Sequence, residues 1–484
     1  MIPIIASDTN LCNCYIDGET ILNCMTNNPY KLDWLPEVSN SSAERYVAIA
    51  ESIGEGIKSG RLKAGQRLPP QRLLAYTLGF NPGTVHKAYR LAMKRGWIVG
   101  EVGRGSFVRG SAAGSVAWPN ENPYDRSIDF CDNYPCPIRT GSLLRKHLVA
   151  AGDAPYFGNL LQYQQNSAWS VHKSVACAWI MRFGVEAHDQ NLLITCGALH
   201  AGFISLLTLC RAGDTILTEE FTSQAIKGAA ARLKLRIRGV RMDRNGMIPE
   251  HLEELLRKEK FAAAYLVPTL HNPTATVLSV SRRRRVAELF SSYNVPFIED
   301  DIFAPLLVEA APPISSFASD LGFYVAGLSK AIAPGLRLAF LRVPDRYYQD
   351  ALANLRITTW LASPLLMEMA SNSISSGDAD KIIEAQKMEI AKRQSMANRM
   401  LADYNLSSHR DALHLWLKLP EPWRASQFKD ELAKREVLVL SSDAFAIERS
   451  NQTHAIRISL GTPPSENKVM EGLKIIHDAL CKSS

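Results

Sequence analysis

Apolar residues recur at intervals of three and four from residue 43 onward, which is the spacing of one face of an amphipathic helix. The stripe consists of Tyr46, Ile49, Ile53 and Ile57. Gly60 follows the stripe and is a typical helix stop. The pattern therefore predicts a helix that begins near residue 43 and ends just before Gly60.

Two further helices and a hairpin are expected next. Periodic leucines predict a short helix over residues 71–78. Asn81 and Pro82 are residue types that cap and open a helix, so a third helix is predicted from Pro82 to about Arg95. Short apolar runs on both sides of the Gly-Arg-Gly sequence at 103–105 then predict a small β-hairpin.

The remaining sequence changes character twice. Residues 109–124 are rich in Gly, Ser, Ala and Pro, which is typical of a linker. Beyond them, apolar runs typical of buried strands alternate with amphipathic segments of helical length; the runs are LLIT, TILT, AAAYLVPT, FIED and FYVAGL. This alternation favours an α/β fold, with a mostly parallel sheet covered by helices on both faces.

Positive charge is concentrated in one part of the chain. Between Arg45 and Gly110 there are twelve Lys or Arg and three Glu, whereas the whole chain has a net charge of only +7. The rest of the chain is therefore slightly acidic. Such a basic segment is the electrostatic signature of a polyanion binder, although charge alone also allows a basic face that meets only solvent.

The helices over residues 71–78 and 82–95 are joined by a short turn and form a helix-turn-helix candidate. In such motifs the second helix enters the major groove while its neighbours contact phosphates. Arg72 is placed for a phosphate, and Arg104 at the hairpin tip is placed to enter the minor groove as a wing. On the second helix, the expected outward residues are Gly83, Thr84, His86, Lys87 and Arg90, and the expected inward residues are Val85, Ala88, Tyr89 and Leu91.

Residues 45–108 resemble the winged helix-turn-helix of the GntR family. The resemblance rests on the elements G-x-L-x-x-G-x-x-L-P, R-x-L-A, T-V-x-x-A-Y and G-R-G-S-F-V, which occur in this order. It implies that this segment binds double-stranded DNA. Asn81-Pro82 stands where the family usually has a Ser-Arg pair, so the operator sequence of relatives cannot be carried over.

Lysine, aspartate and arginine stand near the ends of predicted strands in the C-terminal part. Lys330 follows the run FYVAGL, Arg337 comes seven residues later, and Asp300 ends the run FIED. Pyridoxal phosphate requires a lysine for a Schiff base, a carboxylate that keeps its ring nitrogen protonated, and a cation for its phosphate. We therefore predict that Lys330 is the catalytic residue that anchors this cofactor, with Asp300 at the ring nitrogen.

Neighbouring motifs supply further candidates. Asn272 closes another predicted strand and is placed to donate to the phenolic oxygen of the ring. Ala198 and Leu199 begin a helix after a strand and a glycine turn, so their amides are placed to receive a phosphate. Ser329 precedes the lysine and is grouped with the cofactor-binding residues. Arg457 is expected to bind the carboxylate of a substrate or effector.

The C-terminal blocks resemble the fold-type I aminotransferases, through the elements T-x-G, H-N-P-T, E-D-D, S-K-x-x-x-P-G-L-R and R-x-S-L-G in this order. With the GntR-like segment in front, the chain is similar to the MocR-type regulators. The resemblance implies a homodimer whose cofactor sites borrow residues from both subunits. The expected organisation is an N-terminal extension over 1–42, a winged helix-turn-helix over 43–110, a linker over 111–125 and an aminotransferase-like domain over 126–484.

Three contacts of the resembled family are missing. Ile302 and Phe303 stand where a Tyr usually contacts the ring oxygen, and Ser223 stands where an aromatic residue usually stacks on the ring. Gly327 replaces a phosphate-binding Ser. We expect pyridoxal phosphate to bind, with Phe303 among the residues around it, and efficient transamination to be lost.

The leading interpretation is a cytoplasmic transcription regulator whose DNA binding responds to pyridoxal phosphate, or to an amine or amino acid that reacts with it. One alternative is an aminotransferase or lyase with an accessory DNA-binding domain. Another is a sensor that no longer holds the cofactor.

The remaining signals predict little chemistry. The nine cysteines are scattered without zinc spacing and His86 has no second ligand at helical spacing, so no metal site is expected. No apolar run is long enough for a membrane helix, and the first residues do not resemble a secretory signal. The run Arg282–Arg285 is expected to be a solvated helix face.

Overall fold

The computed structural model describes residues 34–36, 45–63, 65–101, 105–108, 127–138, 141–163, 170–448 and 453–481. They form two compact units, one within Met1–Ser111 and the other within Ala112–Ser484. None of the described helices is both long enough and apolar enough to cross a membrane.

The N-terminal unit contains α2 (Arg45–Lys58), α3 (Gln71–Leu78), α4 (Pro82–Lys94), β1 (Ile98–Glu101) and β2 (Gly105–Val108). These are the predicted elements, and α3 has the predicted bounds. Asn81 caps α4 as predicted, because its side-chain oxygen accepts from the amide of Gly83 at 2.8 Å. The two strands pair antiparallel, with Ile98 opposite Val108, and the turn at 102–104 lies outside the described residues.

Helix α4 packs against α2 through one apolar stripe. Val85, Ala88 and Tyr89 are buried, as predicted. Leu91 is only half-buried, and Ala92 is the fully buried residue of that turn. Positions 85, 88, 89 and 92 follow the helical repeat of three, four and seven residues, which places position 91 beside the stripe.

Trp34 of the N-terminal extension completes this core, a role that the sequence did not reveal. Its side chain is 6% exposed and belongs to the same apolar cluster as Ile49, Ile53 and Leu62. Its Nε1 atom lies 2.9 Å from the position that a Cβ would take on Gly56. The indole therefore approaches α2 only because residue 56 has no side chain.

Trp34→Ala is expected to destabilise the N-terminal unit by about 3 kcal/mol, because it removes a buried indole and leaves a cavity. Hydrogen exchange of the α2 and α4 amides, followed against urea in the full-length protein, measures the change. Leu35 is 43% exposed and serves as the control. Leu35→Ala should cost less than about 0.5 kcal/mol, and equal exchange in both variants would contradict the assignment of Trp34 to the core.

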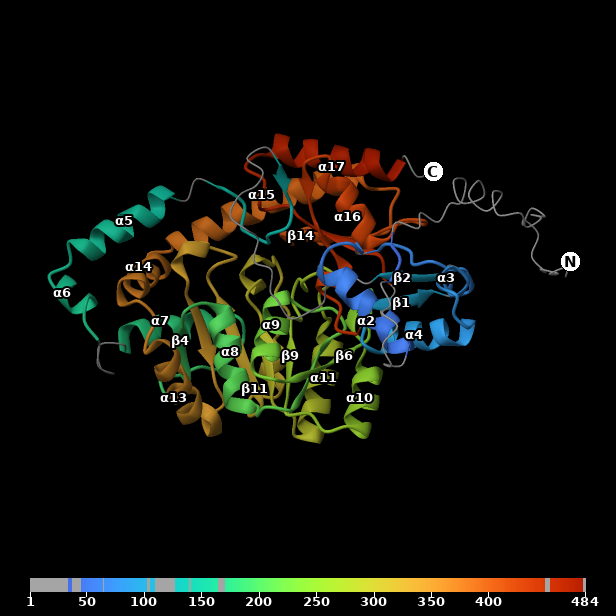
Figure 1. Ribbon diagram of the computed structural model, residues 1–484. Helices are drawn as coiled ribbons and strands as arrows, with labels where there is room; N and C mark the ends of the chain where they lie inside the picture. The colour runs from blue at the N-terminus through green and yellow to red at the C-terminus, as the bar shows by residue number, and fades with distance from the viewer. Residues whose placement is uncertain are drawn as a thin grey trace, which may run out of the picture. The chain divides into compact units, whose positions relative to one another are not determined.

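A seven-stranded sheet forms the centre of the C-terminal unit (Figure 1). Its strands, in spatial order, are β4 (Leu192–Thr195), β12 (Ala339–Arg342), β11 (Gly322–Gly327), β10 (Phe297–Asp300), β9 (Ala263–Leu266), β5 (Thr215–Glu219) and β6 (Arg236–Val240). Strand β12 is antiparallel to both neighbours, and the other pairs are parallel. The five predicted apolar runs are all strands of this sheet, which confirms the α/β fold.

Helices cover both faces of the sheet, as predicted. Neighbouring residues of a strand point to opposite faces. Ile298 packs into one apolar cluster together with residues of α8 (Ala198–Leu209) and α9 (Gln224–Arg232). Phe297 packs into another, with residues of α10 (Pro249–Lys258), α11 (Val280–Tyr293) and α12 (Ile314–Phe317).

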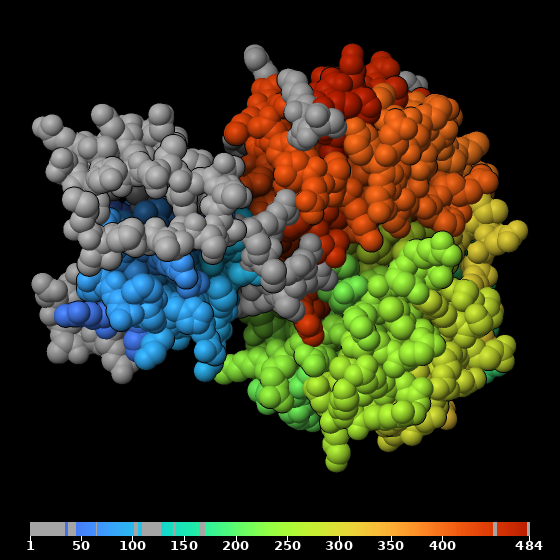
Figure 2. Space-filling model, turned by 90° about the vertical axis from the view of Figure 1, so that its right-hand side faces the viewer, coloured from blue at the N-terminus to red at the C-terminus, as the bar shows by residue number. Residues whose placement is uncertain are grey.

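A smaller sheet lies toward the C-terminus, with the order β13 (Leu406–Ser407), β14 (His414–Lys418), β17 (Ala455–Ser459) and β16 (Leu440–Ser441). Helix α15 (Asp378–Met400) joins the two parts, because Ile382 packs in the large-sheet core and Ala397 in the small-sheet core. Figure 2 shows the orange and red residues of the small-sheet part resting on the green and yellow residues of the large-sheet part. The other described α-helices and strands are β3 (Ile128–Asp129), α5 (Gly141–Gly152), α6 (Phe157–Leu160), α7 (Ser170–Met181), β7 (Met242–Asp243), β8 (Gly246–Met247), α13 (Tyr348–Thr359), α14 (Pro364–Ser375), α16 (Ala425–Ala433), β15 (Val437–Leu438) and α17 (Glu466–Cys481).

The expectation of a solvated face at residues 282–285 is wrong for one member of the run. Arg283 is fully buried and donates to the carbonyl oxygen of Leu278 at 2.9 Å. Its Nη1 atom also lies 3.6 Å from Glu299, another fully buried side chain. A run of four successive residues spans more than one turn of α11, so one of them points inward.

Candidate cofactor site and DNA-binding face

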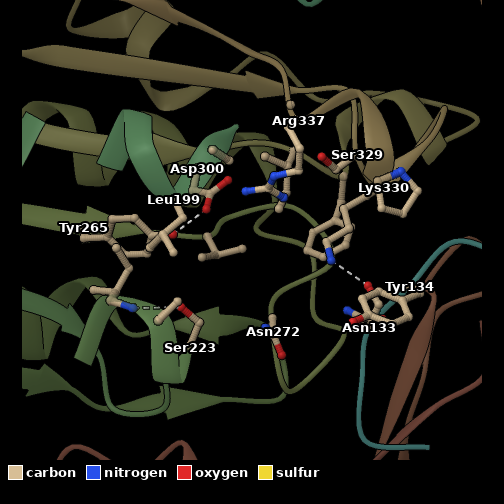
Figure 3. A pocket seen from close by; sticks show the side chains of 18 residues that line it. Asn133, Tyr134, Leu199, Ser223, Tyr265, Asn272, Asp300, Ser329, Lys330 and Arg337 are labelled. Atoms are coloured by element: carbon tan, nitrogen blue, oxygen red, sulfur yellow. Dashed lines mark hydrogen bonds between the residues drawn. The ribbon is translucent and has the colours of Figure 1, made fainter. Parts of the chain in front are cut away.

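A cavity of about 290 Å³ lies at the carboxyl ends of β9, β10 and β11. The eight residues predicted to bind the cofactor all line it (Figure 3): Ala198, Leu199, Asn272, Asp300, Phe303, Ser329, Lys330 and Arg337. They come from separate parts of the sequence. The sheet brings them together, because the carboxyl ends of parallel strands share one edge.

Lys330 lies three residues beyond the end of β11, and its amine points across the cavity (Figure 3). Its Nζ donates to the backbone carbonyl oxygen of Asn133 at 2.6 Å. Burial, together with the positive charge of Arg457, lowers the pKa of the Lys330 amine to about 8. The unprotonated amine, which is the form that attacks an aldehyde, is therefore more populated than in an exposed lysine.

Asp300 ends β10 and is buried. Its Oδ2 accepts a hydrogen bond from the hydroxyl of Tyr265, whereas its Oδ1 has no hydrogen-bond partner among the described residues. Burial raises the pKa of the Asp300 carboxyl to about 6. A buried carboxylate oxygen without a donor is unfavourable, and the N–H of a pyridinium ring is a donor of the required kind. This carboxylate therefore fits the ring nitrogen of pyridoxal phosphate.

A cradle for an anion lies at the start of α8. Gly197 has φ 90°, and α8 begins with the next residue. The Arg337 guanidinium stands over this turn, with Nη2 at 3.0 Å from the position of a Cβ on Gly197, so a side chain at that position would fill the cradle. The first-turn amides of the helix and the guanidinium together favour a phosphate. Ser329 lies beside Arg337 in Figure 3.

Two of the three departures from the resembled family are one packing change. A Cβ on Gly327 would lie 2.7 Å from Cγ2 of Ile302. Ile302 therefore occupies the room that a serine at position 327 would need. Phe303 is buried and lies against the ring of His414, with 6.0 Å between ring centroids. Neither Ile302 nor Phe303 has a hydroxyl group, so neither can offer one to a ligand in the cavity.

Arg457 lies behind Asn272 rather than among the residues that line the cavity. Its Nη1 donates to Asn272 Oδ1 at 2.7 Å, and its Nη2 donates to the carbonyl oxygen of Cys131. The guanidinium carbon also lies 4.9 Å from the ring centroid of Phe445. Burial lowers the pKa of Arg457 to about 10. The predicted carboxylate-binding group is thus adjacent to the cavity but engaged with the protein.

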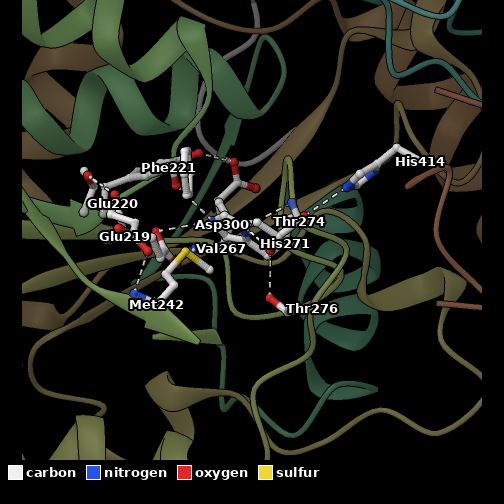
Figure 4. Close-up of polar contacts among 12 residues, drawn as sticks. Glu219, Glu220, Phe221, Met242, Val267, His271, Thr274, Thr276, Asp300 and His414 are labelled. Carbon is white, nitrogen blue, oxygen red and sulfur yellow. Dashed lines mark hydrogen bonds and ion pairs between the residues drawn. The ribbon is translucent and has the colours of Figure 1, made fainter. Parts of the chain in front are cut away.

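A network of buried polar groups surrounds the chain from the end of β9 to His271, next to Asn272 (Figure 4). Glu219 accepts from the amide of Val267 at 2.8 Å, and burial raises the pKa of this carboxyl to about 7. His271 lies 2.8 Å from Thr274 Oγ1, and the Nε2 atom of His414 lies 2.9 Å from the carbonyl oxygen of His271. These contacts fix the loop that carries Asn272.

Sequence reasoning missed three polar residues that line the cavity: Asn133, Tyr134 and Tyr265. Tyr265 had a detectable signal, because it lies within the apolar run AAAYLVPT, which leads toward the edge of the sheet where ligands are expected. Asn133 and Tyr134 had none. They lie close behind the predicted linker, and long-range contacts alone bring them to Lys330.

The N-terminal unit presents most of the predicted DNA-contacting residues on its surface. Exposed side chains or backbone positions are found at Arg72, Gly83, His86, Lys87 and Arg90, whereas Thr84 is half-buried. The Nδ1 atom of His86 lies 3.0 Å from Gln71 Oε1, which links α4 to α3. Arg104 lies outside the described residues.

Comparison with known proteins identifies both units. Residues 143–473 match the family model of aminotransferase class I and II, and residues 45–108 match that of the bacterial regulatory proteins of the gntR family. The chain belongs to the aminotransferase class I and II family.

Two relatives that match nearly their whole length to this chain are named as transcriptional regulators. An uncharacterised HTH-type transcriptional regulator of Bacillus subtilis, YdeF, is 30% identical over 93% of this chain and 97% of its own. The vitamin B6 salvage pathway transcriptional repressor PtsJ of Salmonella typhimurium is 27% identical over 89% of this chain and 97% of its own.

Solved aminotransferases share the fold of this family member. An archaeal alanine:glyoxylate aminotransferase superposes with a TM-score of 0.69 at 20% identity, over 74% of this chain and 92% of its own. A kynurenine aminotransferase of Pyrococcus horikoshii superposes with a TM-score of 0.68 at 22% identity, over 74% of this chain and 91% of its own. The expected fold-type I architecture is confirmed.

Proposed function

We propose that this protein is a transcription regulator that binds operator DNA through α4 and senses pyridoxal phosphate, or an amine or amino acid that reacts with it, through its aminotransferase-like unit. The cavity carries the proposal, because a lysine amine, an unsatisfied buried carboxylate and an arginine beside a helix N-terminus converge there. Similarity to a repressor named for vitamin B6 salvage supports this class of ligand. The gntR-type reader supports double-stranded DNA as the partner.

The residues around the cavity divide the binding work among them. Lys330 supplies the amine, Asp300 accepts from the ring nitrogen, and Asn272 donates to the ring oxygen. The phosphate is held by the Arg337 guanidinium and by the amides of Ala198 and Leu199. When bound, pyridoxal phosphate supplies an aldehyde and an electron-withdrawing ring.

A sensor is favoured over an aminotransferase by the absence of hydroxyls at Ile302 and Phe303. The packing of Ile302 against Gly327 also leaves no room for a serine there. The rival function predicts amino transfer from an amino acid to a keto acid, lost in Lys330→Ala. Measured turnover of that kind would revive it.

Arg457 is proposed to receive the carboxylate of an amino-acid effector. It lies beside Asn272, and a carboxylate forms a stronger, charge-assisted pair with a guanidinium than a neutral carbonyl does.

A homodimer is proposed from exposed apolar residues in and next to α5, α6, α7 and the end of α13, elements that share one end of the unit in Figure 1. These are Leu148, Val149, Tyr156, Leu161, Tyr163, Val171, Met181, Ile357 and Trp360. Tyr163 is 81% and Ile357 82% exposed, and exposed apolar patches mark interfaces. Analytical ultracentrifugation tests this, since a monomer at micromolar concentration would contradict it.

The pKa of Lys330 predicts how cofactor attachment depends on pH. Because burial lowers this pKa to about 8, the rate should rise about tenfold per pH unit below pH 8 and level off above it. Stopped-flow absorbance with excess pyridoxal phosphate measures the rate, after subtraction of the Lys330→Ala signal. A rate that still rises through pH 10 would mean that the amine titrates as an ordinary lysine.

Genome-wide DNA pull-down with and without pyridoxal phosphate tests the regulator itself, and the fragments recovered give the operator. On that operator, Lys87→Ala should weaken binding and reduce the salt dependence by about one phosphate contact. Lys58 is also exposed but ends α2, so Lys58→Ala is the matched control and should leave both unchanged. Equal losses in the two variants would mean that only general charge attracts the DNA.

A further inference from the structure

Two of the three cationic groups at the site, Lys330 and Arg457, are held by carbonyl oxygens of one short segment, residues 131–134. Lys330 Nζ donates to the carbonyl oxygen of Asn133, and Arg457 Nη2 donates to that of Cys131. Figure 3 shows the Lys330 amine facing Asn133 and Tyr134. Nothing in the proposed function uses these two bonds.

The 131–134 segment is seated by contacts with the small-sheet part. Thr462 Oγ1 donates to the carbonyl oxygen of Asp132, and the side-chain amide of Asn133 lies 2.9 Å from His414 Nδ1. A Cβ on Gly461 would overlap the carbonyl oxygen of Tyr134, so only glycine lets the segment pass there. The position of the 131–134 segment is therefore fixed by contacts of its own, in addition to its hydrogen bonds with Lys330 and Arg457.

The two carbonyls stand where ligand groups are expected. The amine of Lys330 awaits an aldehyde, and the guanidinium of Arg457 awaits a carboxylate. A backbone carbonyl is a neutral acceptor that satisfies both cations while no ligand does so.

We propose that the 131–134 segment is an internal ligand of the pocket, which pyridoxal phosphate at Lys330 and a carboxylate at Arg457 each displace. The inference rests on the proposed function and names its regulation. Because the same four residues carry both carbonyls, release of one bond weakens the other, and the two ligands bind with positive coupling.

The chemistry at Lys330 removes the donor. When the neutral amine condenses with an aldehyde, a C=N bond forms and the aldehyde oxygen leaves as water with the two amine hydrogens. The nitrogen then keeps neither of its original hydrogens, and a proton taken up by the C=N nitrogen is directed to the adjacent ring oxygen and not to the Asn133 carbonyl. Its hydrogen bond is lost, whatever else the ligand contacts.

The 131–134 segment lies close in sequence to the N-terminal DNA-binding unit, so loss of the Lys330–Asn133 hydrogen bond affects the connection to that unit. The segment follows β3, which pairs with β15, and residues 109–126 join it to β2 of the reader. It is thus the part of the cofactor site nearest in sequence to the DNA-binding unit. Ligand binding in the cavity therefore changes the contacts of the 131–134 segment, which follows the connection between the two units.

The first test uses the full-length protein without cofactor or DNA. Thr462→Val removes the hydrogen bond to the carbonyl oxygen of Asp132, so amide exchange in residues 127–138 should accelerate about threefold to tenfold. Pyridoxal phosphate should also bind more tightly, because its competitor is weakened. Thr208→Val is the matched control, since Thr208 Oγ1 bonds at the far end of α8. Unchanged exchange, or weaker cofactor binding in Thr462→Val, would overturn the proposal.

The second test compares pyridoxal phosphate with 4′-deoxypyridoxine 5′-phosphate, which lacks the aldehyde. Exchange in residues 127–138 should accelerate with the aldehyde only, and Lys330→Ala should show fast exchange without any ligand. If pyridoxal phosphate attaches, as its absorbance reports, but exchange is unchanged or slowed, the internal-ligand proposal is wrong while the proposed function stands. Absence of the absorbance, with slow exchange kept, would instead defeat the proposed function.

Discussion

Lys330→Ala is expected to abolish covalent attachment of pyridoxal phosphate and to weaken its retention on the order of 100-fold, equivalent to about 2.7 kcal/mol. The variant keeps the Asp300 carboxylate and the Arg337 cradle, so weak binding through ring and phosphate should remain. Loss of the Schiff-base absorbance, with affinity from equilibrium dialysis, measures both effects. Operator binding should also become insensitive to pyridoxal phosphate.

Lys227 offers a matched control for this variant. Burial lowers the pKa of Lys227 to about 8 as well, but its Nζ donates to the carbonyl oxygens of Ala444 and Ala446, and it does not line the cavity. Lys227→Met should keep the absorbance. Borohydride reduction followed by peptide mass spectrometry should place the label on Lys330 alone. A label on Lys227 would show that a lowered pKa, and not the cavity, selects the lysine.

The helices, strands and cofactor-binding residues that the sequence predicted were recognised from local sequence patterns, which do not depend on contacts between distant parts of the chain. Asn81 caps α4 because side-chain acceptor and backbone donors are two residues apart, a contact that needs no tertiary information. Lys330 and Asp300 were found because each stands at or just after the carboxyl end of an apolar run, where α/β sheets place their ligands. For that reason the fold and most of the residues that line the cavity could be predicted from the sequence.

The rest depends on contacts between distant parts of the chain. Trp34 reaches α2 across an extension without periodicity, and Asn133 meets Lys330 across 197 positions. Ile302 and Gly327 appear in the sequence as two unrelated departures, and only their packing shows that they are one change. Helical periodicity also cannot tell which arginine of a run of four faces a buried glutamate.

Arg283→Leu is expected to cost about 3 kcal/mol of stability, because it removes the cation that lies 3.6 Å from the buried Glu299 carboxyl and leaves that group only its hydrogen bonds from Ile314 and Ser315. It also removes donors from the carbonyl oxygens of Leu278 and Pro268, at 2.9 and 3.1 Å. Urea unfolding of the full-length protein measures the loss. Arg285→Leu in the same run is the control, since Arg285 is exposed and its ion pairs with Glu253 and Glu288 should contribute about 1 kcal/mol or less.

Arg283 should also matter to the cofactor site, although it touches no part of the cavity. Its Nη2 donates to Thr269 Oγ1 at 2.8 Å and so holds the loop between β9 and Asn272, while Glu299 immediately precedes Asp300. Arg283→Leu loosens both sides of the ring site at once. We therefore expect weaker retention of pyridoxal phosphate even at temperatures where the variant remains folded. Full retention in a destabilised variant would show that Arg283 supports the fold alone and that Asn272 and Asp300 are positioned by other contacts.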